Sequence, residues 1–257
     1  MVIDFSKITI YELLALCLSL IAILIPIVQW VWKKFVVRPD LKHYPTGRAY
    51  LFTNKSGSYI QFQGVFEALK KSISIRNIKL KIVRKKDDKA LNLTWSVLMS
   101  PVNQQIVGAY ASASEIAHPF RIEADSVACA FIEFSDFYEA SEKTLRPYFE
   151  RLEEAIHTLD ISNKSYDEAY KEFVVLDEYK DIKSAMEQEM FWIISEYEMI
   201  LEVEYAEQKV SFNYNFDVSN ENVDDLKHNM DETITSLLKS KYGIPLNCKT
   251  IQVQVKS

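Results

Sequence analysis

The pair Glu153 and His157 has the residue types and the spacing of an acid–base site. The two lie four residues apart in a helical stretch, where a carboxylate can orient an imidazole. Solvated side chains on a helix surface have the same spacing, and we expect that simpler role here. A hydrolase whose site is assembled from distant residues, such as His118 and His157, is the enzymatic alternative.

Local signatures of the common catalytic, cofactor and metal sites are absent from the sequence. The five glycines lie at least seven residues apart, which excludes the glycine-rich loops that bind nucleotide phosphates. The chain has no G-x-S-x-G motif, and it has neither the H-E-x-x-H nor the C-x-x-C spacing of local zinc sites. We therefore predict a protein that is not an enzyme and that holds no cofactor and no metal.

Charge is divided unequally along the chain. Residues 33–89 carry 15 Lys and Arg against 4 Asp and Glu, a net of +11, and residues 136–205 carry 7 against 19, a net of −12. The whole chain is only −6. Nucleic-acid binding is disfavoured as a use of the basic segment, because its lysines alternate with inward-facing apolar residues on strand-like runs. Solvated strand faces and attraction to anionic lipid headgroups are the two other uses.

A stretch without charged residues runs from Leu13 to Trp32. About 20 apolar residues at 1.5 Å per residue span the ~30 Å hydrocarbon core of a bilayer. The preceding MVIDFSK has no net basic charge and no small-residue cleavage site follows, so we predict a retained anchor rather than a cleaved signal peptide or a buried core helix. Aromatic and cationic residues then follow that are expected at the membrane interface: Trp30, Trp32, Lys33, Lys34 and Arg38.

The positive residues also predict an orientation. Lys7 alone precedes the span, whereas several lysines and arginines follow it within residues 33–48. The positive-inside rule places residues 1–12 outside and the remainder in the cytoplasm, as in a single-pass protein of a bacterial inner membrane. Cys129 and Cys248 are far apart in the sequence and do not form a disulfide framework. This cysteine pattern agrees with the predicted cytoplasmic location.

Two residues within the span are candidates for a helix–helix contact in the membrane. Pro26 removes a backbone hydrogen bond from the helix. Gln29 either reaches the membrane interface or donates a hydrogen bond to a second copy of the helix. The second alternative would make the chain a homo-oligomer.

The elements that must position these residues fall into three sections after a basic linker at 33–47. In the first, residues 48–135, apolar residues such as Ile78, Leu80 and Ile82 alternate with polar ones. Several such runs predict an antiparallel β-sandwich of immunoglobulin-like or fibronectin-like architecture. In residues 136–196 the apolar residues instead repeat every three or four positions, and Ser165-x-x-Glu168 is a capping box, so we predict a helical hairpin.

The last section, residues 197–257, predicts a ββαβ unit. Two alternating runs are separated by Glu207-Gln208-Lys209, a helix follows that ends before Gly243, and a strand at 251–255 closes the chain. The predicted fold class is therefore α+β: a transmembrane helix at 13–32, a β-sandwich, a helical hairpin and a ββαβ unit.

Residues 41–101 resemble those of bacterial membrane-anchored proteins with a cytoplasmic β-sandwich. The resemblance rests on Tyr44-Pro45-Thr46-Gly47 after the anchor and on Trp95 in a later strand. It implies the architecture and a bacterial origin, and no activity.

We expect a membrane-anchored recognition or scaffold protein that binds a protein partner at the inner face of the membrane. Basic strands near anionic headgroups would turn the acidic helices away from the lipid. The expected partner surface consists of five carboxylates: Glu153, Glu154, Glu168, Glu172 and Asp181. The alternative is a membrane-acting effector of bacterial anti-phage defence, whose soluble domain senses a signal and clusters the transmembrane helices through Pro26 and Gln29.

Overall fold

The computed structural model describes residues 9–55, 57–106, 109–135, 141–159, 163–206 and 208–256. It begins with helix α1 (Ile10–Val31), which a π-helical turn (Trp32–Val36) extends. Of the predicted outer segment 1–12, residues 1–8 lie outside this description. The apolar run Leu13–Val36 has a mean hydropathy of 2.5 and none of it is buried. It is therefore not a core helix of the described fold, and a membrane span stays the prediction.

Seven strands follow, then three helices, two strands, a helix and a last strand. The first strands are β1 (Asp40–Asn54), β2 (Gly57–Leu69), β3 (Ile73–Arg84), β4 (Lys89–Ile106), β5 (Ala109–Ile116), β6 (Phe120–Ile122) and β7 (Ser126–Ser135). The remaining elements are α2 (Ser141–Thr158), α3 (Tyr166–Phe173), α4 (Asp177–Glu189), β8 (Ser195–Tyr205), β9 (Gln208–Val218), α5 (Asn220–Lys241) and β10 (Ile251–Lys256).

The described strands form one antiparallel sheet that closes into a barrel. Their order is β5-β4-β7-β2-β1-β10-β9-β8-β3-β6, and an additional β3–β4 pairing closes the eight strands from β4 to β3 into a ring. The predicted β-sandwich is therefore wrong. Apolar alternation reports which face of a strand is buried, and that pattern is the same in a sandwich and in a barrel.

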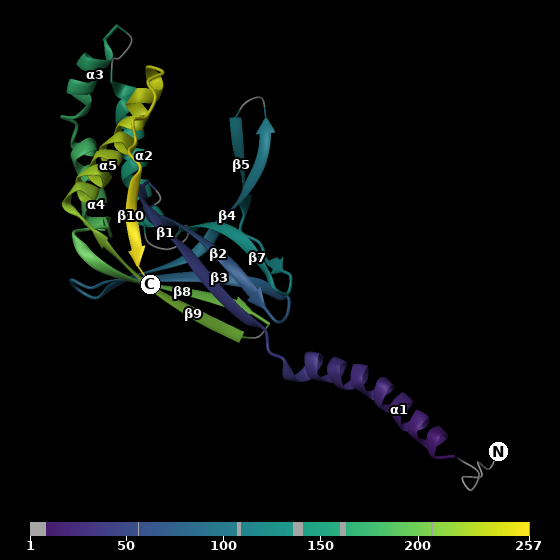
Figure 1. The fold of residues 1–257 in the computed structure, drawn as a ribbon. Helices are drawn as coiled ribbons and strands as arrows, with labels where there is room; N and C mark the ends of the chain where they lie inside the picture. The colour runs from purple at the N-terminus through teal and green to yellow at the C-terminus, as the bar shows by residue number, and fades with distance from the viewer. Residues whose placement is uncertain are drawn as a thin grey trace.

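Strand β4 makes the closure possible. Its residues Lys89–Thr94 pair with β3, and residues 94–99 pair with β7 across a register shift between Trp95 and Val97. A β-bulge of this kind bends a strand and increases its twist, so that one strand can leave β3 and join β7. The far half of β4 pairs with β5 and extends away from the barrel (Figure 1).

The C-terminal strands belong to the same barrel. The predicted element order ββαβ is confirmed, but β10 pairs with β1 and with β9, and β8 pairs with β3. In the sequence, helices α2, α3 and α4 thus lie between β7 and β8, which belong to the same sheet. Residues 40–47, predicted as part of a linker, lie in β1.

The helical section contains more helices than predicted. The capping box is confirmed, since Ser165 Oγ accepts from the Glu168 amide and the Glu168 carboxylate accepts from the Ser165 amide. The helix that it starts ends at Phe173, and α4 begins at Asp177. Residues 190–194 lie beyond α4 without helical structure, although the apolar stripe had predicted a helix there.

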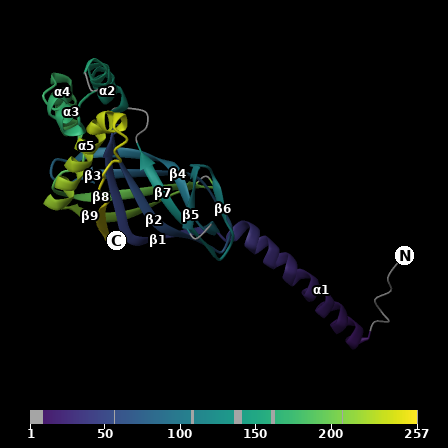
Figure 2. The ribbon, with the colours of Figure 1, turned by 90° about the horizontal axis from the view of Figure 1, so that it is seen from above.

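The helices and the anchor lie at opposite ends of the barrel (Figures 1 and 2). Helices α2 to α5 gather where β1 ends and β8 begins, which we call the distal end. Helix α1 leaves from the start of β1, which we call the proximal end. A single cluster of buried apolar side chains fills the barrel and continues under the helices.

Candidate functional site

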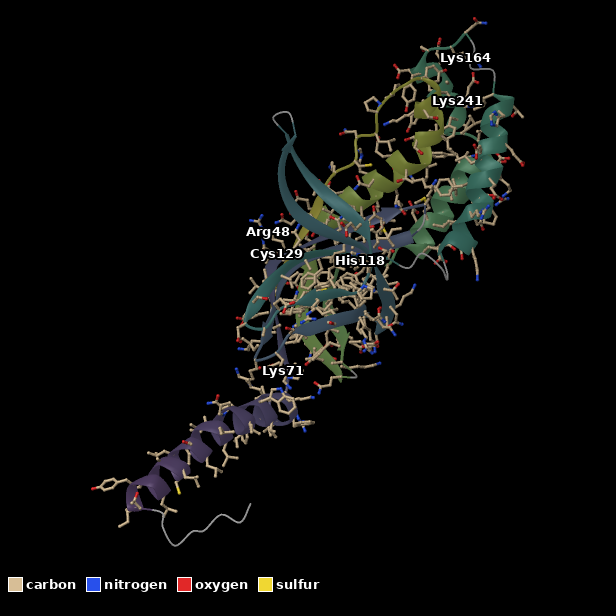
Figure 3. The ribbon with its side chains drawn as sticks, turned by 90° about the vertical axis from the view of Figure 1, so that its right-hand side faces the viewer. Arg48, Lys71, His118, Cys129, Lys164 and Lys241 are labelled. Carbon is tan, nitrogen blue, oxygen red and sulfur yellow. The ribbon has the colours of Figure 1, made fainter. Side chains whose placement is uncertain are left out.

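The predicted membrane-interface residues lie together at the proximal end. Trp30, Trp32, Lys33, Lys34 and Arg38 are all exposed. The Lys34 ammonium lies 4.7 Å from the ring centroid of Trp30, a cation–π contact. Lys71, from the turn between β2 and β3, donates a hydrogen bond to the carbonyl oxygen of Lys34 at 3.0 Å. Figure 3 shows Lys71 beside the end of α1. The fold thus adds a distant lysine to the cluster that the sequence predicted.

The predicted contact residues within the span, Pro26 and Gln29, are exposed along α1. Neither is covered by the barrel or by the helical section, in the part of the chain that the structure describes. Their use as a helix–helix contact stays a prediction.

The five predicted partner carboxylates divide into two groups. Glu168 is held by the capping box, Glu172 accepts from Lys164 at 2.7 Å, and Asp181 lies 3.7 Å from Arg151 of α2. Glu153 and Glu154 are exposed on α2 and form no ion pair or hydrogen bond with another described residue. Only this adjacent pair is fully available to a partner.

The residues considered for acid–base chemistry are not brought together. His157 and Glu153 are both exposed, and no hydrogen bond or ion pair joins them among the described residues. His118 precedes β6, is half exposed, and lies 3.7 Å from Glu115. Figure 3 shows His118 beside the strands of the barrel, whereas His157 lies on α2. A hydrolase site built on these two histidines has no geometric support.

The charge division of the sequence is partly cancelled in the fold. Strand β3 carries the exposed lysines Lys79 and Lys81, and its neighbour β8 carries a series of glutamates. Lys79 lies directly opposite Glu202 in the ladder, an arrangement that stabilises a sheet. The basic segment therefore does not form one continuous surface.

Sequence reasoning missed a buried histidine inside the proximal half of the barrel. His43 of β1 is 8% exposed, and rings of β2 and β9 surround it: Phe62, Phe66, Phe212 and Tyr214. Its Nδ1 lies 2.7 Å from Oη of Tyr214, within hydrogen-bond distance. Burial lowers the pKa of His43 from 6.5 to about 4 and raises the pKa of Tyr214 to about 12. Both groups are therefore neutral near pH 7.

Gly64 of β2 makes room for this imidazole. A Cβ atom at Gly64 would lie only 2.0 Å from Nε2 of His43. The sequence did contain a signal, because a single glycine inside a strand marks a close approach of another group. The alternation of Leu41 with His43 places the histidine on the same buried face.

Strand β10 pairs with residues 48–51 of β1 and with Asn215 and Phe216 of β9, and it ends at Lys256. In the described residues, 40–47 of β1 and 208–214 of β9 have no strand partner on that side. Beyond the point labelled C in Figure 1, β1 and β9 continue toward α1.

The distal end is closed by side chains. Trp192 precedes β8, is fully buried, and donates from Nε1 to the carbonyl oxygen of Phe52 at the end of β1, at 3.1 Å. Tyr197 stacks on Phe216 with ring centroids 5.1 Å apart. Arg84 donates to the carbonyl oxygen of Phe191 at 2.6 Å. These contacts fix residues 190–194 over the barrel core.

An ion pair supports Arg84 in that position. The Arg84 guanidinium donates two hydrogen bonds to the Asp87 carboxylate, at 2.8 and 2.7 Å. This bidentate contact lowers the pKa of Asp87 to about 2. The turn between β3 and β4, which contains Asp87, thus also supports the distal closure.

Comparison with known proteins does not assign the chain to a family. No protein-family model and no curated protein matches it. A solved structure of a family 123 glycoside hydrolase from Clostridium perfringens, described for glycolipid glycan hydrolysis, matches with a TM-score of 0.30 and 12% identity. The match covers 71% of this chain and 28% of the hydrolase. At this similarity it carries no argument about fold or activity.

Proposed function

We propose that the chain is a single-pass membrane-anchored recognition protein whose distal helices bind a protein partner at the inner face of a bacterial membrane. The observation that carries this proposal is the placement of α1 and the acidic helices at opposite ends of the barrel. With α1 in the bilayer, the barrel lies next to the lipid and α2 faces the solvent beyond it.

Electrostatics favours this arrangement. Lys33, Lys34, Arg38 and Lys71 lie where anionic headgroups would meet the proximal end, and each cation near such a surface contributes about 1 kcal/mol. The exposed carboxylates Glu153 and Glu154 lie on the helices that point away, where repulsion from the lipid is weakest. A partner with a basic surface fits this pair.

The test is affinity purification of the full-length chain from solubilised membranes, with Glu153→Lys and Glu154→Lys combined. We expect recovery of the specific partner to fall at least tenfold. The matched control combines Glu187→Lys and Glu189→Lys, which makes the same change of charge on α4, where both residues are also exposed, and should leave recovery unchanged. Equal recovery of every partner by the wild type and the α2 variant would refute the surface.

The predicted orientation needs its own measurement. Protease treatment of intact spheroplasts should leave the barrel and helices uncut, while treatment of inverted membrane vesicles should degrade them. Release of the chain from membranes by alkaline carbonate would contradict the anchor.

A further inference from the structure

We propose that the turn between β2 and β3 holds the C-terminal end of α1 through Lys71, so that the anchor and the barrel move as one rigid body. The inference rests on the proposed membrane insertion of α1 and is independent of the partner surface on α2. Two features carry it: a short connection between α1 and β1, and a second contact that comes from a different part of the barrel.

The connection between the anchor and the barrel is short and stiff. The π-helical turn ends at Val36 and β1 begins at Asp40, so only residues 37–39 connect the two elements. Pro39 has a fixed φ and also restricts the backbone of the residue before it. A connection of this length and composition permits far fewer orientations of the barrel than a flexible linker does.

A second contact restricts the remaining freedom. The Lys71 ammonium donates a hydrogen bond to the carbonyl oxygen of Lys34 at 3.0 Å; we call this contact the Lys71 latch. The last carbonyl groups of a helix lack partners within the helix and carry partial negative charge, so a cation is favoured there. Lys71 is 37 residues further along the chain, and Figure 3 shows it beside the end of α1. The anchor is therefore tied to the barrel at two separate points, which restricts rotation about the connection at 37–39.

The side chains of the last turn order the group that Lys71 binds. The Lys34 ammonium lies 4.7 Å from the ring centroid of Trp30 and 5.5 Å from that of Phe35. The two rings meet edge to face, with centroids 6.4 Å apart. These contacts hold the turn together, so the carbonyl oxygen of Lys34 is presented to Lys71 in one position.

A rigid connection has a consequence for the distal helices. Helix α1 and helices α2 to α5 lie at opposite ends of the barrel (Figures 1 and 2). A change in the tilt of α1 therefore displaces the distal helices more than it displaces the proximal end. A second copy packed against α1 would, by changing this tilt, move the surface that carries Glu153 and Glu154.

Double electron–electron resonance on the full-length chain, at one chain per lipid nanodisc, tests the latch. The native cysteines Cys17, Cys129 and Cys248 are all exposed and are replaced by serine. Spin labels are attached at Ile21→Cys on α1 and at Lys81→Cys on β3, two positions that are also exposed. We expect one narrow distribution of the distance between the labels.

The variant Lys71→Asn removes the donor and should widen this distribution at least twofold. The matched control is Lys70→Asn, which removes the same charge from the adjacent residue. The Lys70 side chain is exposed and forms no hydrogen bond or ion pair with another described residue, and asparagine tolerates its φ of 68°. The control should leave the distribution narrow, as should Lys71→Arg, which keeps a cationic donor.

A reference for a flexible tether combines Lys71→Asn with a Gly-Ser-Gly insertion between Arg38 and Pro39. A wild-type distribution as broad as this reference would overturn the proposal, because the anchor would then be a simple tether. Equal widths for Lys70→Asn and Lys71→Asn would overturn it as well, since the second contact would not depend on Lys71. A chain that does not enter the nanodisc would refute the anchor itself, and with it the membrane role of the latch.

Discussion

The two ends of the barrel are held together by different contacts. At the distal end, Trp192, Tyr197 and Arg84 bring buried rings and hydrogen bonds over the core. At the proximal end, β1 and β9 meet at His43, which lies within hydrogen-bond distance of Tyr214 and contacts the ring of Phe212. One closed sheet thus combines an end held by many mutually supporting contacts with a seam held by few.

This difference indicates where the barrel can change without unfolding. Segments with few buried contacts and unpaired backbone groups open at low free-energy cost, whereas densely packed segments open only with the whole domain. We therefore expect stability to depend more on the distal end than on the seam.

The largest effect is expected at the distal end, from Trp192→Ala. Removing a fully buried indole from a packed core costs about 3–5 kcal/mol. Trp192→Phe keeps a ring and loses the hydrogen bond to Phe52, so it should cost about 1–2 kcal/mol. Chemical denaturation of the full-length chain in detergent, followed by circular dichroism, measures both.

A matched control for this prediction is Trp95→Ala, because Trp95 is only half-buried on β4. It should lose less stability than Trp192→Ala. If the two variants were equally stable, the distal closure would not depend on Trp192, and the contrast between the ends would fail.

The seam should give the barrel a pH dependence through His43. Because the pKa of His43 is about 4 in the fold and 6.5 ordinarily, the unfolded chain binds a proton between these values that the folded chain does not. Stability is therefore full above pH 6.5, falls as the pH drops from about 6.5 to about 4, and then loses nothing more through this group. At 1.36 kcal/mol per pKa unit, the loss is about 3 kcal/mol.

The variant His43→Gln isolates this contribution, since carboxylates such as Asp87 titrate in both proteins. The difference in unfolding free energy between wild type and His43→Gln, measured from pH 8 to pH 4, should shrink as the pH falls. A constant difference over that range would mean that His43 is protonated equally in both states.

Local patterns in the sequence predicted the elements but not their closure. The alternation of Ile78, Leu80 and Ile82 identified the buried face of β3, and the capping box located the start of α3. The barrel depends on the pairing of β10 with β1, some two hundred residues apart, and on a bulge near Trp95. Neither leaves a local signature, because register over such separations is decided by the whole core.

In the candidate site, too, local sequence patterns predicted some features, whereas others depend on contacts between distant residues. The exposure of Glu153 and Glu154 followed from helical spacing. The capping box that predicted α3 already committed Glu168 to that helix, so its inclusion in the partner surface was inconsistent with the pattern itself. Glu172 pairs with Lys164, and Asp181 pairs with Arg151. The helical periodicity of the sequence does not predict these two ion pairs. His43 was missed because its meaning depends on Gly64 in the neighbouring strand.

The smallest expected effects come from substitutions of two glycines in the paired strands β1 and β2. They test the packing around His43 most directly. Gly64→Ala drives a Cβ atom into the His43 ring and should cost about 1–3 kcal/mol. Gly47→Ala meets no atom within 4 Å, but Gly47 has a φ of +79°, so alanine there should cost about 1–2 kcal/mol through the backbone alone. Adding His43→Ala removes the ring and should recover stability only for Gly64→Ala. Equal, additive losses for both glycines would mean that the imidazole does not rest on Gly64.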